Sequence, residues 1–274
     1  MRQNRYIPKN LKYPYPIDTA SHYLKITMDR GYIFDENYPY IDNSKSFKRK
    51  QALVRLLLNL IVFPLTKIKM GLKIMGKENL NKDIFNNGLI TVSNHVHMWD
   101  YIAIMKALKP YKPNVLVWDK NVNDKDGKLV RLVGGIPIPS NLSASKAYFK
   151  AINELLNNKG ILHIYAEGSM WEYYPYIRPF KSGCATIAMK NKKNILPIGF
   201  SYRKPSWFRK HIMHQYAAIT LNIGKVIDIN GLTRDEILKE CHNKVCELSF
   251  IDNNPYDYNY NNSKRIDGIL DENK

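Results

Sequence analysis

Residues 88–100, GLITVSNHVHMWD, decide the fold and point to a functional site. Leu89–Ser93 begins with four apolar or β-branched residues, a run that is typical of a strand buried on both faces of a sheet. Polar side chains then follow abruptly, from Ser93 to Asp100. Because open α/β sheets bind ligands at the carboxyl ends of their strands, this polar segment is the first candidate for a site.

From Leu72 onward, short apolar runs alternate with helical periodicity. This pattern predicts an α/β fold, with helices flanking a central sheet that is largely parallel or mixed. The expected strands are Leu72–Met75, Leu89–Ser93, Val115–Trp118, Ile161–Tyr165, Ile195–Phe200 and Ile219–Ile223. The expected helices are Trp99–Leu108, Ser145–Leu156, Cys184–Lys190 and Arg234–Leu248, the last opened by the capping-box pattern Thr233-x-x-Glu236. We expect an N-terminal helical or irregular extension over residues 1–71, a catalytic domain over 72–250 and a polar tail over 251–274.

Composition restricts the possible partners. The chain has 274 residues, 45% of them apolar or aromatic, which is enough for a sizeable core. Its three cysteines form no disulfide framework, so a reducing compartment is expected. The net charge of +18 favours an anionic membrane, a phosphate-bearing ligand or a nucleic acid. No nucleic-acid-binding motif accompanies the basic residues, so a nucleic acid partner is not expected, and a non-catalytic protein that binds anionic surfaces remains an alternative.

The most apolar stretch lies in the N-terminal extension. A helix over Ala52–Phe63 would be about 18 Å long, too short for a hydrocarbon core of about 30 Å, so no membrane-spanning helix is expected. Gln51, Arg55 and Asn59 would form one narrow polar stripe on it. Basic residues flank it on both sides: Lys48, Arg49, Lys50, Lys67 and Lys69. The pattern suits a helix in the plane of an anionic membrane surface and fits an ordinary core helix equally well. With no secretory signal at the N-terminus, we expect a cytoplasmic protein, peripheral on the inner face of the cell membrane.

His95 and Asp100 form the sharpest chemical pair. They are five residues apart, which would separate them by about 140° on a continuous helix. They can meet if His95 lies in the turn and Asp100 in the first turn of the next helix, where the helix dipole favours a carboxylate. Asp100 would then accept a hydrogen bond from His95 Nδ1 and leave Nε2 as a general base. Without a serine beside it, such a base needs a nucleophile from the substrate, for instance an alcohol.

A zinc-dependent hydrolase using His95, His97 and Asp100 is the competing interpretation. Alternate residues of a strand share a face, so His95-x-His97 could bind zinc together with the carboxylate. The HxHxDH pattern of binuclear hydrolases needs a carboxylate one position earlier and a further histidine, and neither is present. We therefore expect no metal. A simple helix-capping role for Asp100 is the third interpretation.

Residues 161–190, ILHIYAEGSMWEYYPYIRPFKSGCATIAMK, repeat the arrangement of a buried strand that ends in polar groups. Gly168 permits close backbone approach, Glu167 can bind hydroxyls, and Lys181 leads into a helix N-terminus, which is a natural anion site. Ser169 does not lie in a G-x-S-x-G nucleophile elbow. Cys184 fits a buried packing residue better than an activated thiol.

Together the two segments resemble the glycerolipid and lysophospholipid acyltransferase family, the relatives of 1-acylglycerol-3-phosphate acyltransferase. The four blocks of that family occur in order over about residues 72–250: Asn94-His95-x₄-Asp100, Gly134–Ile138, Ala166–Ser169 followed by Phe180–Gly183, and Ile195–Ile198. Asn94, Gly135 and Pro197 are the supporting residues of these motifs.

This resemblance implies transfer of a fatty acyl chain from acyl-CoA or acyl carrier protein to the hydroxyl of a lysolipid such as lysophosphatidic acid, with no cofactor other than the acyl donor. By match, His95 would be the general base and Asp100 its orienting partner. The residues that match the acceptor site are Glu167, Gly168 and Ser169, with Arg178 and Lys181 after them.

The sequence departs from the family at two positions. Arginines are usual in the second and third blocks, where this chain has Pro139 or Ser140 and Met170. Basic residues elsewhere could take their place: Arg131, Lys146, Arg178 or Lys181. A glycolipid acceptor without a phosphate is therefore the alternative within this family.

Overall fold

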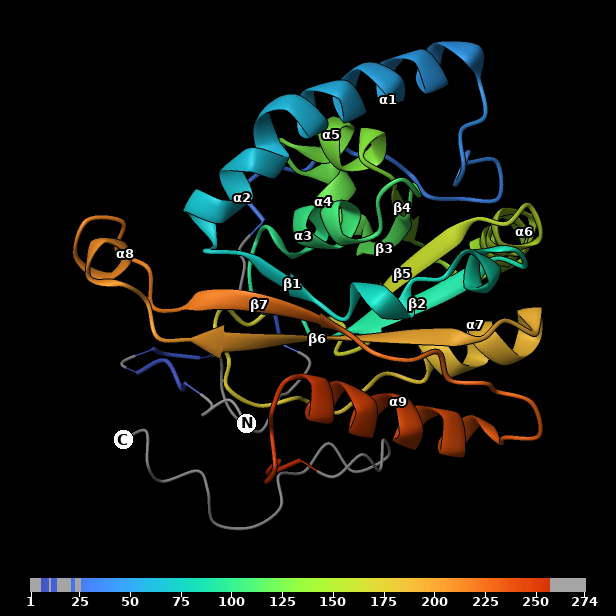
Figure 1. Ribbon diagram of the computed structural model, residues 1–274. Coiled ribbons are helices and arrows are strands. Elements are labelled where there is room, and N and C mark those ends of the chain that lie inside the picture. Colours follow the sequence, from blue (N-terminus) through green and yellow to red (C-terminus); the bar gives the residue numbers. More distant parts are fainter. Residues whose placement is uncertain (1–5, 10, 14–20, 23–25, 257–274) are drawn as a thin grey trace.

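The computed structural model describes residues 6–9, 11–13, 21–22 and 26–256. Its centre is a seven-stranded sheet in the order β1-β7-β6-β2-β5-β3-β4 (Figure 1). The strands are β1 Lys73–Met75, β2 Leu89–Ser93, β3 Asn114–Trp118, β4 Gly135–Ile138, β5 Ile161–Tyr165, β6 Ile195–Arg203 and β7 Ala218–Ile223. The β6–β7 pair is antiparallel, and the other neighbouring pairs are parallel. The predicted α/β fold with a mixed sheet is confirmed.

Helices cover both faces of this sheet, with α7 and α9 on one side and α1, α2 and α3 on the other (Figure 1). The helices are α1 Lys45–Leu57, α2 Phe63–Lys69, α3 Asp100–Ala107, α4 Asp119–Asn123, α5 Gly127–Leu132, α6 Ser145–Asn157, α7 Gly183–Asn191, α8 Trp207–His211 and α9 Arg234–Leu248. Short 3₁₀ turns occupy Lys77–Asn79, Lys82–Phe85 and Leu142–Ala144. Ile90 of β2 packs into the apolar cluster under α6, α7 and α9, whereas Leu89 packs into the cluster under α3. The alternation along β2 therefore supplies both halves of the core.

The six expected strands are all present, two of them (β2 and β5) with the expected bounds. The four expected helices correspond to α3, α6, α7 and α9. The capping box of α9 is formed as expected, because the Glu236 N–H donates to Thr233 Oγ1 while the Thr233 N–H donates to the Glu236 carboxylate. The short helices α4, α5 and α8 were not expected.

The N-terminal helix is longer than the sequence indicated. The helix α1, a π-helical turn over Leu58–Val62 and α2 join into one helix over Lys45–Lys69, 25 residues in all, or about 37 Å. By length and composition it could cross a membrane, so the prediction of a helix only about 18 Å long is wrong. Lysine and arginine are good helix formers, and the helix therefore continues through the basic flanks where the apolar periodicity stops.

This helix turns its apolar side outward. Its buried residues are Leu58, Phe63 and Thr66. Its outward leucine and isoleucine side chains are 47–66% exposed: Leu53, Leu56, Leu57, Leu60 and Ile61. Arg55, in contrast, is half-buried. This orientation is the reverse of that of a surface helix in a water-soluble domain, and it rules out an ordinary core helix.

The ends of the chain add little regular structure. In the described parts of residues 6–44 there is no helix or strand. Ile251 and Tyr256, at the start of the predicted tail, are buried against the domain. The remainder of that tail, 257–274, lies outside the described residues, and the division at residues 71 and 250 stays a prediction.

Candidate active site

A cavity of about 390 Å³ opens at the carboxyl ends of the neighbouring parallel strands β2, β5, β3 and β4. His95 reaches it from the turn after β2. Trp118, Ile138 and Tyr165, which end β3, β4 and β5, line the same cavity, and Gly168 follows β5. The two polar segments that the sequence singled out therefore meet at one site.

His95 and Asp100 are hydrogen-bonded side chain to side chain, with 3.1 Å between His95 Nδ1 and Asp100 Oδ2. Asp100 is the first residue of α3 and is fully buried. Its Oδ2 also accepts the backbone N–H groups of Val96 at 2.6 Å and His97 at 2.9 Å. Because backbone N–H groups can only donate, Oδ2 acts as an acceptor in these contacts. With the hydrogen between the two side chains on Nδ1, the lone pair of the neutral imidazole is on Nε2.

Two further contacts fix His95 in place. Its ring stacks on the ring of Tyr165, with centroids 3.7 Å apart. Its backbone N–H donates to Glu167 Oε2 at 2.9 Å. The side chain is 22% exposed, and the exposed part belongs to the cavity wall. The imidazole is held in one orientation at the cavity.

Glu167 and Arg178 lie beneath the cavity wall rather than in it. They are 2% and 1% exposed, and Arg178 Nη2 is 3.2 Å from Glu167 Oε2. The Arg178 N–H donates to the other carboxylate oxygen at 2.8 Å, and its Nη1 donates to Ser169 Oγ at 2.7 Å. The guanidinium also faces the ring of Trp171 at 4.5 Å. The pair therefore holds the segment after β5 together, a different position from the direct acceptor contact that the sequence predicted.

The other predicted acceptor residues are at the cavity or beside it. Gly168 and Ser169 line it. Gly168 has a φ of +81°, and the side chain of Lys181 passes so close that a β-carbon on Gly168 would lie 3.3 Å from Lys181 Cγ. A glycine is required here both for the backbone conformation and to leave room for Lys181.

The three supporting motif residues have structural positions. Asn94 joins the end of β2 to β6, because its Oδ1 accepts the Phe200 N–H at 2.8 Å and its Nδ2 donates to the Phe200 carbonyl. Pro197 pairs with Val92 in the parallel β2–β6 ladder. Gly135 begins β4, where a β-carbon would lie 2.7 Å from the Val130 side chain. None of the three lines the cavity.

The His97 side chain contacts Trp99 and Tyr173. Its Nδ1 accepts the Trp99 N–H at 3.0 Å, and its ring meets the ring of Tyr173 edge-on. Within the described residues, no three His, Cys, Asp or Glu side chains are grouped as metal ligands. The geometry gives the zinc-hydrolase interpretation no support.

Residues 71–201, which include β1 to β5 and most of β6, match the protein-family model described as Acyltransferase. The matched residues form an acyltransferase domain. The crystal structure of the 1-acyl-sn-glycerophosphate (LPA) acyltransferase PlsC from Thermotoga maritima has a similar fold. It is 18% identical, with a TM-score of 0.52, over 76% of this chain and 82% of that chain. No curated protein sequence matches this chain. The resemblance drawn from the four sequence blocks, and the enzyme class that it implied, are confirmed.

Several residues of the acyltransferase site carried no sequence signal. Tyr165 and Trp118 lie within apolar strand patterns, and His22 stacks on Trp118 with ring centroids 3.9 Å apart. His163 lies behind Tyr165 and is fully buried, with its Nδ1 2.8 Å from Thr91 Oγ1. Burial lowers the pKa of His163 to about 3, which keeps it neutral. Burial also raises the pKa of the Cys184 thiol to about 12, in agreement with its predicted packing role.

The cations proposed to replace the missing arginines are not in the acyltransferase cavity. Its described lining contains no lysine or arginine. Arg131 donates to the backbone carbonyls of Tyr40 and Gly135 instead. Three basic groups lie beside lining residues: Arg178 donates to Ser169 Oγ at 2.7 Å, the side chain of Lys181 passes Gly168, and Lys120 Nζ is 5.9 Å from the Trp118 ring centroid.

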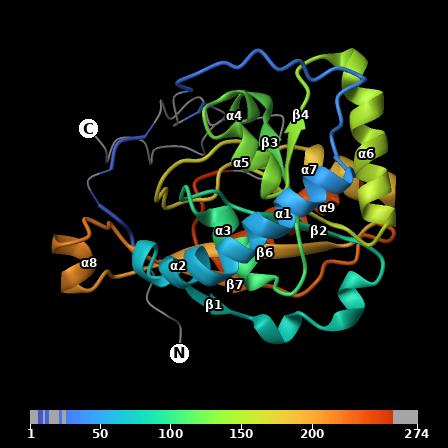
Figure 2. The same cartoon turned by 90° about the horizontal axis from the view of Figure 1, so that it is seen from above.

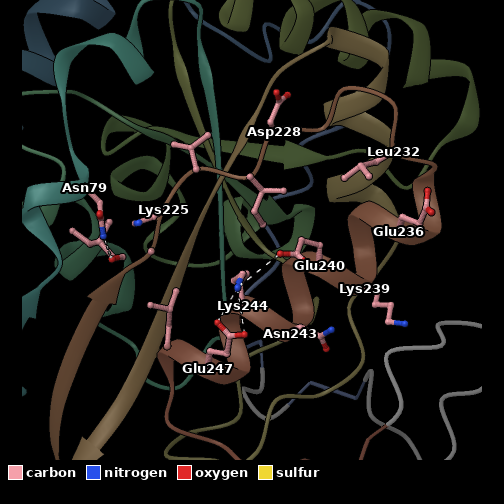
Figure 3. Close-up of a pocket in the computed structure, with 15 residues that line it drawn as sticks. Asn79, Lys225, Asp228, Leu232, Glu236, Lys239, Glu240, Asn243, Lys244 and Glu247 are labelled. Atoms are coloured by element: carbon pink, nitrogen blue, oxygen red, sulfur yellow. Dashed lines mark hydrogen bonds and ion pairs between the residues drawn. The ribbon is translucent and has the colours of Figure 1, made fainter. Parts of the chain in front are cut away.

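A larger hollow of about 750 Å³ lies between α9 and the segment after β7 (Figure 3). Two of its carboxylates, Glu240 and Glu247, pair with Lys244. Because β7 is antiparallel to β6, this hollow is at the edge of the sheet opposite His95. No residue predicted to belong to the active site lines it.

Proposed function

We propose that this acyltransferase moves a fatty acyl chain from a thioester, acyl-CoA or acyl carrier protein, to the hydroxyl of a lysophospholipid of the lysophosphatidic acid type. The observation that carries the proposal is the position of His95. Its Nδ1 is bound to the buried carboxylate of Asp100, and the side chain forms part of a cavity wall at the strand ends. No cofactor other than the acyl donor and no nucleic acid partner is proposed.

The chemistry follows from the free lone pair of His95. Nε2 takes the proton of the acceptor hydroxyl while the hydroxyl oxygen attacks the thioester carbonyl carbon. The Asp100 carboxylate stabilises the imidazolium that forms. The tetrahedral intermediate then collapses, the carbon–sulfur bond breaks, and the thiolate takes the proton from His95. A thiol pKa of about 8.5 makes that thiolate a good leaving group, so no enzyme nucleophile is needed.

The dyad is tested by His95→Ala and Asp100→Asn in assays with acyl-CoA and with acyl carrier protein as donors. We expect His95→Ala to lower kcat by about 10²–10⁴-fold, because the base is lost. Asp100→Asn should cost less, since only orientation and charge stabilisation are impaired. Circular dichroism spectra and Tm values should show that both variants fold. Near wild-type turnover by a folded His95→Ala variant would refute the mechanism.

Lys181 is the proposed contact for an acceptor phosphate, because its side chain runs beside Gly168 at the cavity. A second candidate acceptor is an uncharged glycolipid, which the lining favours because it contains the Asp119 carboxylate and, among its described residues, no cation. Lys181→Ala should raise KM for lysophosphatidic acid at least about fivefold and leave KM for the acyl donor unchanged. Lys82→Ala, an exposed change before β2 at the opposite edge of the sheet, is the matched control. Faster turnover of a glycolipid acceptor, with no effect of Lys181→Ala, would favour the second candidate.

The outward side of the helix over Lys45–Lys69 supports attachment to an anionic membrane. The helix exposes its leucines and contains no Asp or Glu among its basic residues. Its middle is packed on the domain, because Leu58 and Phe63 contact Met105 of α3. A helix whose middle is held against the domain in this way fits the plane of the membrane surface better than a crossing orientation. We place the enzyme peripherally on the cytoplasmic face of the cell membrane.

A further inference from the structure

The segment that runs from the last residue of β6 toward β7, residues 203–216, exposes large apolar side chains. We call it the α8 loop. Trp207 is 70% exposed, Phe208 55%, Ile212 53% and Tyr216 47%. In Figure 1 the helix α8 projects beyond the end of the sheet. Several exposed large apolar side chains in one short segment are typical of an interaction site.

The charge of the α8 loop indicates the kind of partner. Its sequence, RKPSWFRKHIMHQY, contains four lysine or arginine residues and no Asp or Glu. Lys204 and Lys210 are exposed on either side of Trp207 and Phe208 in the sequence. Exposed aromatic residues among basic ones are typical of segments that lie in the interface of an anionic bilayer. Tryptophan and tyrosine suit that position, because each has an apolar ring with a polar group.

Hydrogen bonds fix the α8 loop to the end of the N-terminal helix. Arg209 Nη1 donates to the Ile68 carbonyl at 2.8 Å, and its Nη2 donates to the Lys67 carbonyl. Gln215 Nε2 donates to the carbonyls of Ile68 and Lys69. Figures 1 and 2 both show α8 beside α2. The α8 loop is therefore attached at the end of α2, where Ile68 is 50% exposed.

The topology places both elements at the edge of the sheet that carries the active site. The strand β6 is parallel to β2, so the α8 loop leaves β6 at the same edge at which His95 leaves β2. The strand β1 is parallel to β7, which is antiparallel to β6. The start of β1, and with it the end of α2, is consequently at that edge as well.

We propose that the α8 loop is a second membrane contact, which inserts Trp207, Phe208 and Ile212 into the interface of an anionic bilayer. Lys204 and Lys210 then lie at the level of the anionic headgroups. The inference rests on the proposed function in one respect, the neighbouring attachment of α1 and α2. It does not depend on the acyl acceptor or on the role of His95.

Tryptophan fluorescence of the full-length protein tests the insertion directly. The chain has four tryptophans, and Trp171 is buried. Vesicles of phosphatidylcholine with phosphatidylglycerol should shift the emission to the blue, and brominated acyl chains should quench it. Trp207→Phe keeps an apolar ring, so the variant should still bind while most of the vesicle-dependent change disappears. An equal change in wild type and Trp207→Phe would overturn the proposal.

Vesicle flotation measures how much the α8 loop contributes to the affinity for anionic vesicles. The double variants Trp207→Ser with Phe208→Ser, and Lys204→Gln with Lys210→Gln, should each weaken binding about tenfold. Lys225→Gln with Lys239→Gln is the matched control: it removes the same charge at the hollow of Figure 3 and should change binding less than about twofold. Turnover on detergent-dispersed acceptor and Tm should stay unchanged in all variants. If the loop variants lose vesicle binding while the wild-type protein binds vesicles but shows no acyl transfer, the proposed function is contradicted and the membrane proposal stands.

Unchanged vesicle binding by both loop variants would overturn the proposal. If the Trp207→Ser and Phe208→Ser pair instead abolished self-association, measured by light scattering, the loop would be an interface between two copies of the chain, and the membrane proposal would be wrong.

Discussion

The imidazole of His95 lies flat against the phenol ring of Tyr165, with centroids 3.7 Å apart and ring planes 11° apart. Tyr165 ends β5, and within the described part of the chain its buried hydroxyl has no hydrogen-bond partner. Burial raises the pKa of this hydroxyl well above 10. His95 is therefore supported by the aromatic face and not by the hydroxyl.

Tyr165→Phe should keep kcat within about twofold of wild type, because the ring face remains. It should also leave Tm equal or higher, since a buried hydroxyl without a partner is removed. Tyr165→Ala should lower kcat about tenfold or more, because His95 loses its support. The kcat–pH profile of Tyr165→Phe should match that of wild type. A large loss of activity in Tyr165→Phe would show that the hydroxyl takes part in the reaction.

His97→Ala should be mild, with kcat within about threefold of wild type, because the His97 side chain does not line the cavity. Steady-state assays beside His95→Ala provide the comparison. Elemental analysis of the purified protein accompanies them. Stoichiometric zinc, together with a loss as deep as that of His95→Ala, would restore the hydrolase interpretation.

Arg178→Ala should lower the free energy of unfolding by about 3–5 kcal/mol, because it leaves the buried carboxylate of Glu167 without its charged partner. Urea denaturation provides the measurement. Lys181→Ala is the control, since its side chain is only half-buried and should affect stability little. A stable Arg178→Ala variant whose sole defect is a raised acceptor KM would instead support the direct acceptor contact predicted from the sequence.

At pH values below about 6.5 the free energy of unfolding should decrease, because the folded chain keeps His163 neutral. The unfolded chain takes up a proton near pH 6.5, whereas the folded chain, with its His163 pKa of about 3, does not. The contribution of neutral His163 is therefore complete above pH 6.5 and declines as the pH falls toward 3. Between about pH 7.5 and about pH 5.5, wild type should lose about 1.4 kcal/mol more unfolding free energy than His163→Gln. Urea unfolding curves at the two pH values measure this difference, and identical pH dependence in both proteins would contradict it.

Leu57→Asp with Ile61→Asp should release the protein from anionic vesicles and preserve turnover on detergent-dispersed acceptor. The two side chains are 47% and 54% exposed, so the charges meet water when the protein is not bound. Leu58→Asp, one position away, is buried and should destabilise the domain instead. Flotation assays and Tm values separate the two effects. Unfolding of the Leu57 and Ile61 double variant would mean that this side of the helix packs against protein.

The local parts of this fold were predictable because short-range patterns determine them. The apolar run of β2 is buried on both faces, so its bounds follow from composition alone. The His95–Asp100 pair was predictable because a turn followed by a helix leaves one geometry in which side chains five apart can meet.

The other features depend on contacts between distant residues. Nothing local distinguishes a Glu167 that binds a hydroxyl from one that pairs with Arg178, eleven residues later. The apolar pattern gave too short an N-terminal helix, because Lys45–Lys50 continue the helix without continuing the periodicity. The sequence does not distinguish the α8 loop from an ordinary connection between strands. Its position is determined by a distant contact, the hydrogen bond from Arg209 to the end of α2.

The shared sheet edge of His95 and the α8 loop has a kinetic consequence. An enzyme attached to a bilayer beside its own catalytic base meets its acceptor by lateral diffusion in the leaflet. The quantity that governs its rate is then the mole fraction of acceptor among the surrounding lipids, and no longer moles per litre. Diluting the acceptor with inert phospholipid at constant bulk concentration should slow the reaction, whereas diluting the whole suspension, while the enzyme stays bound, should not.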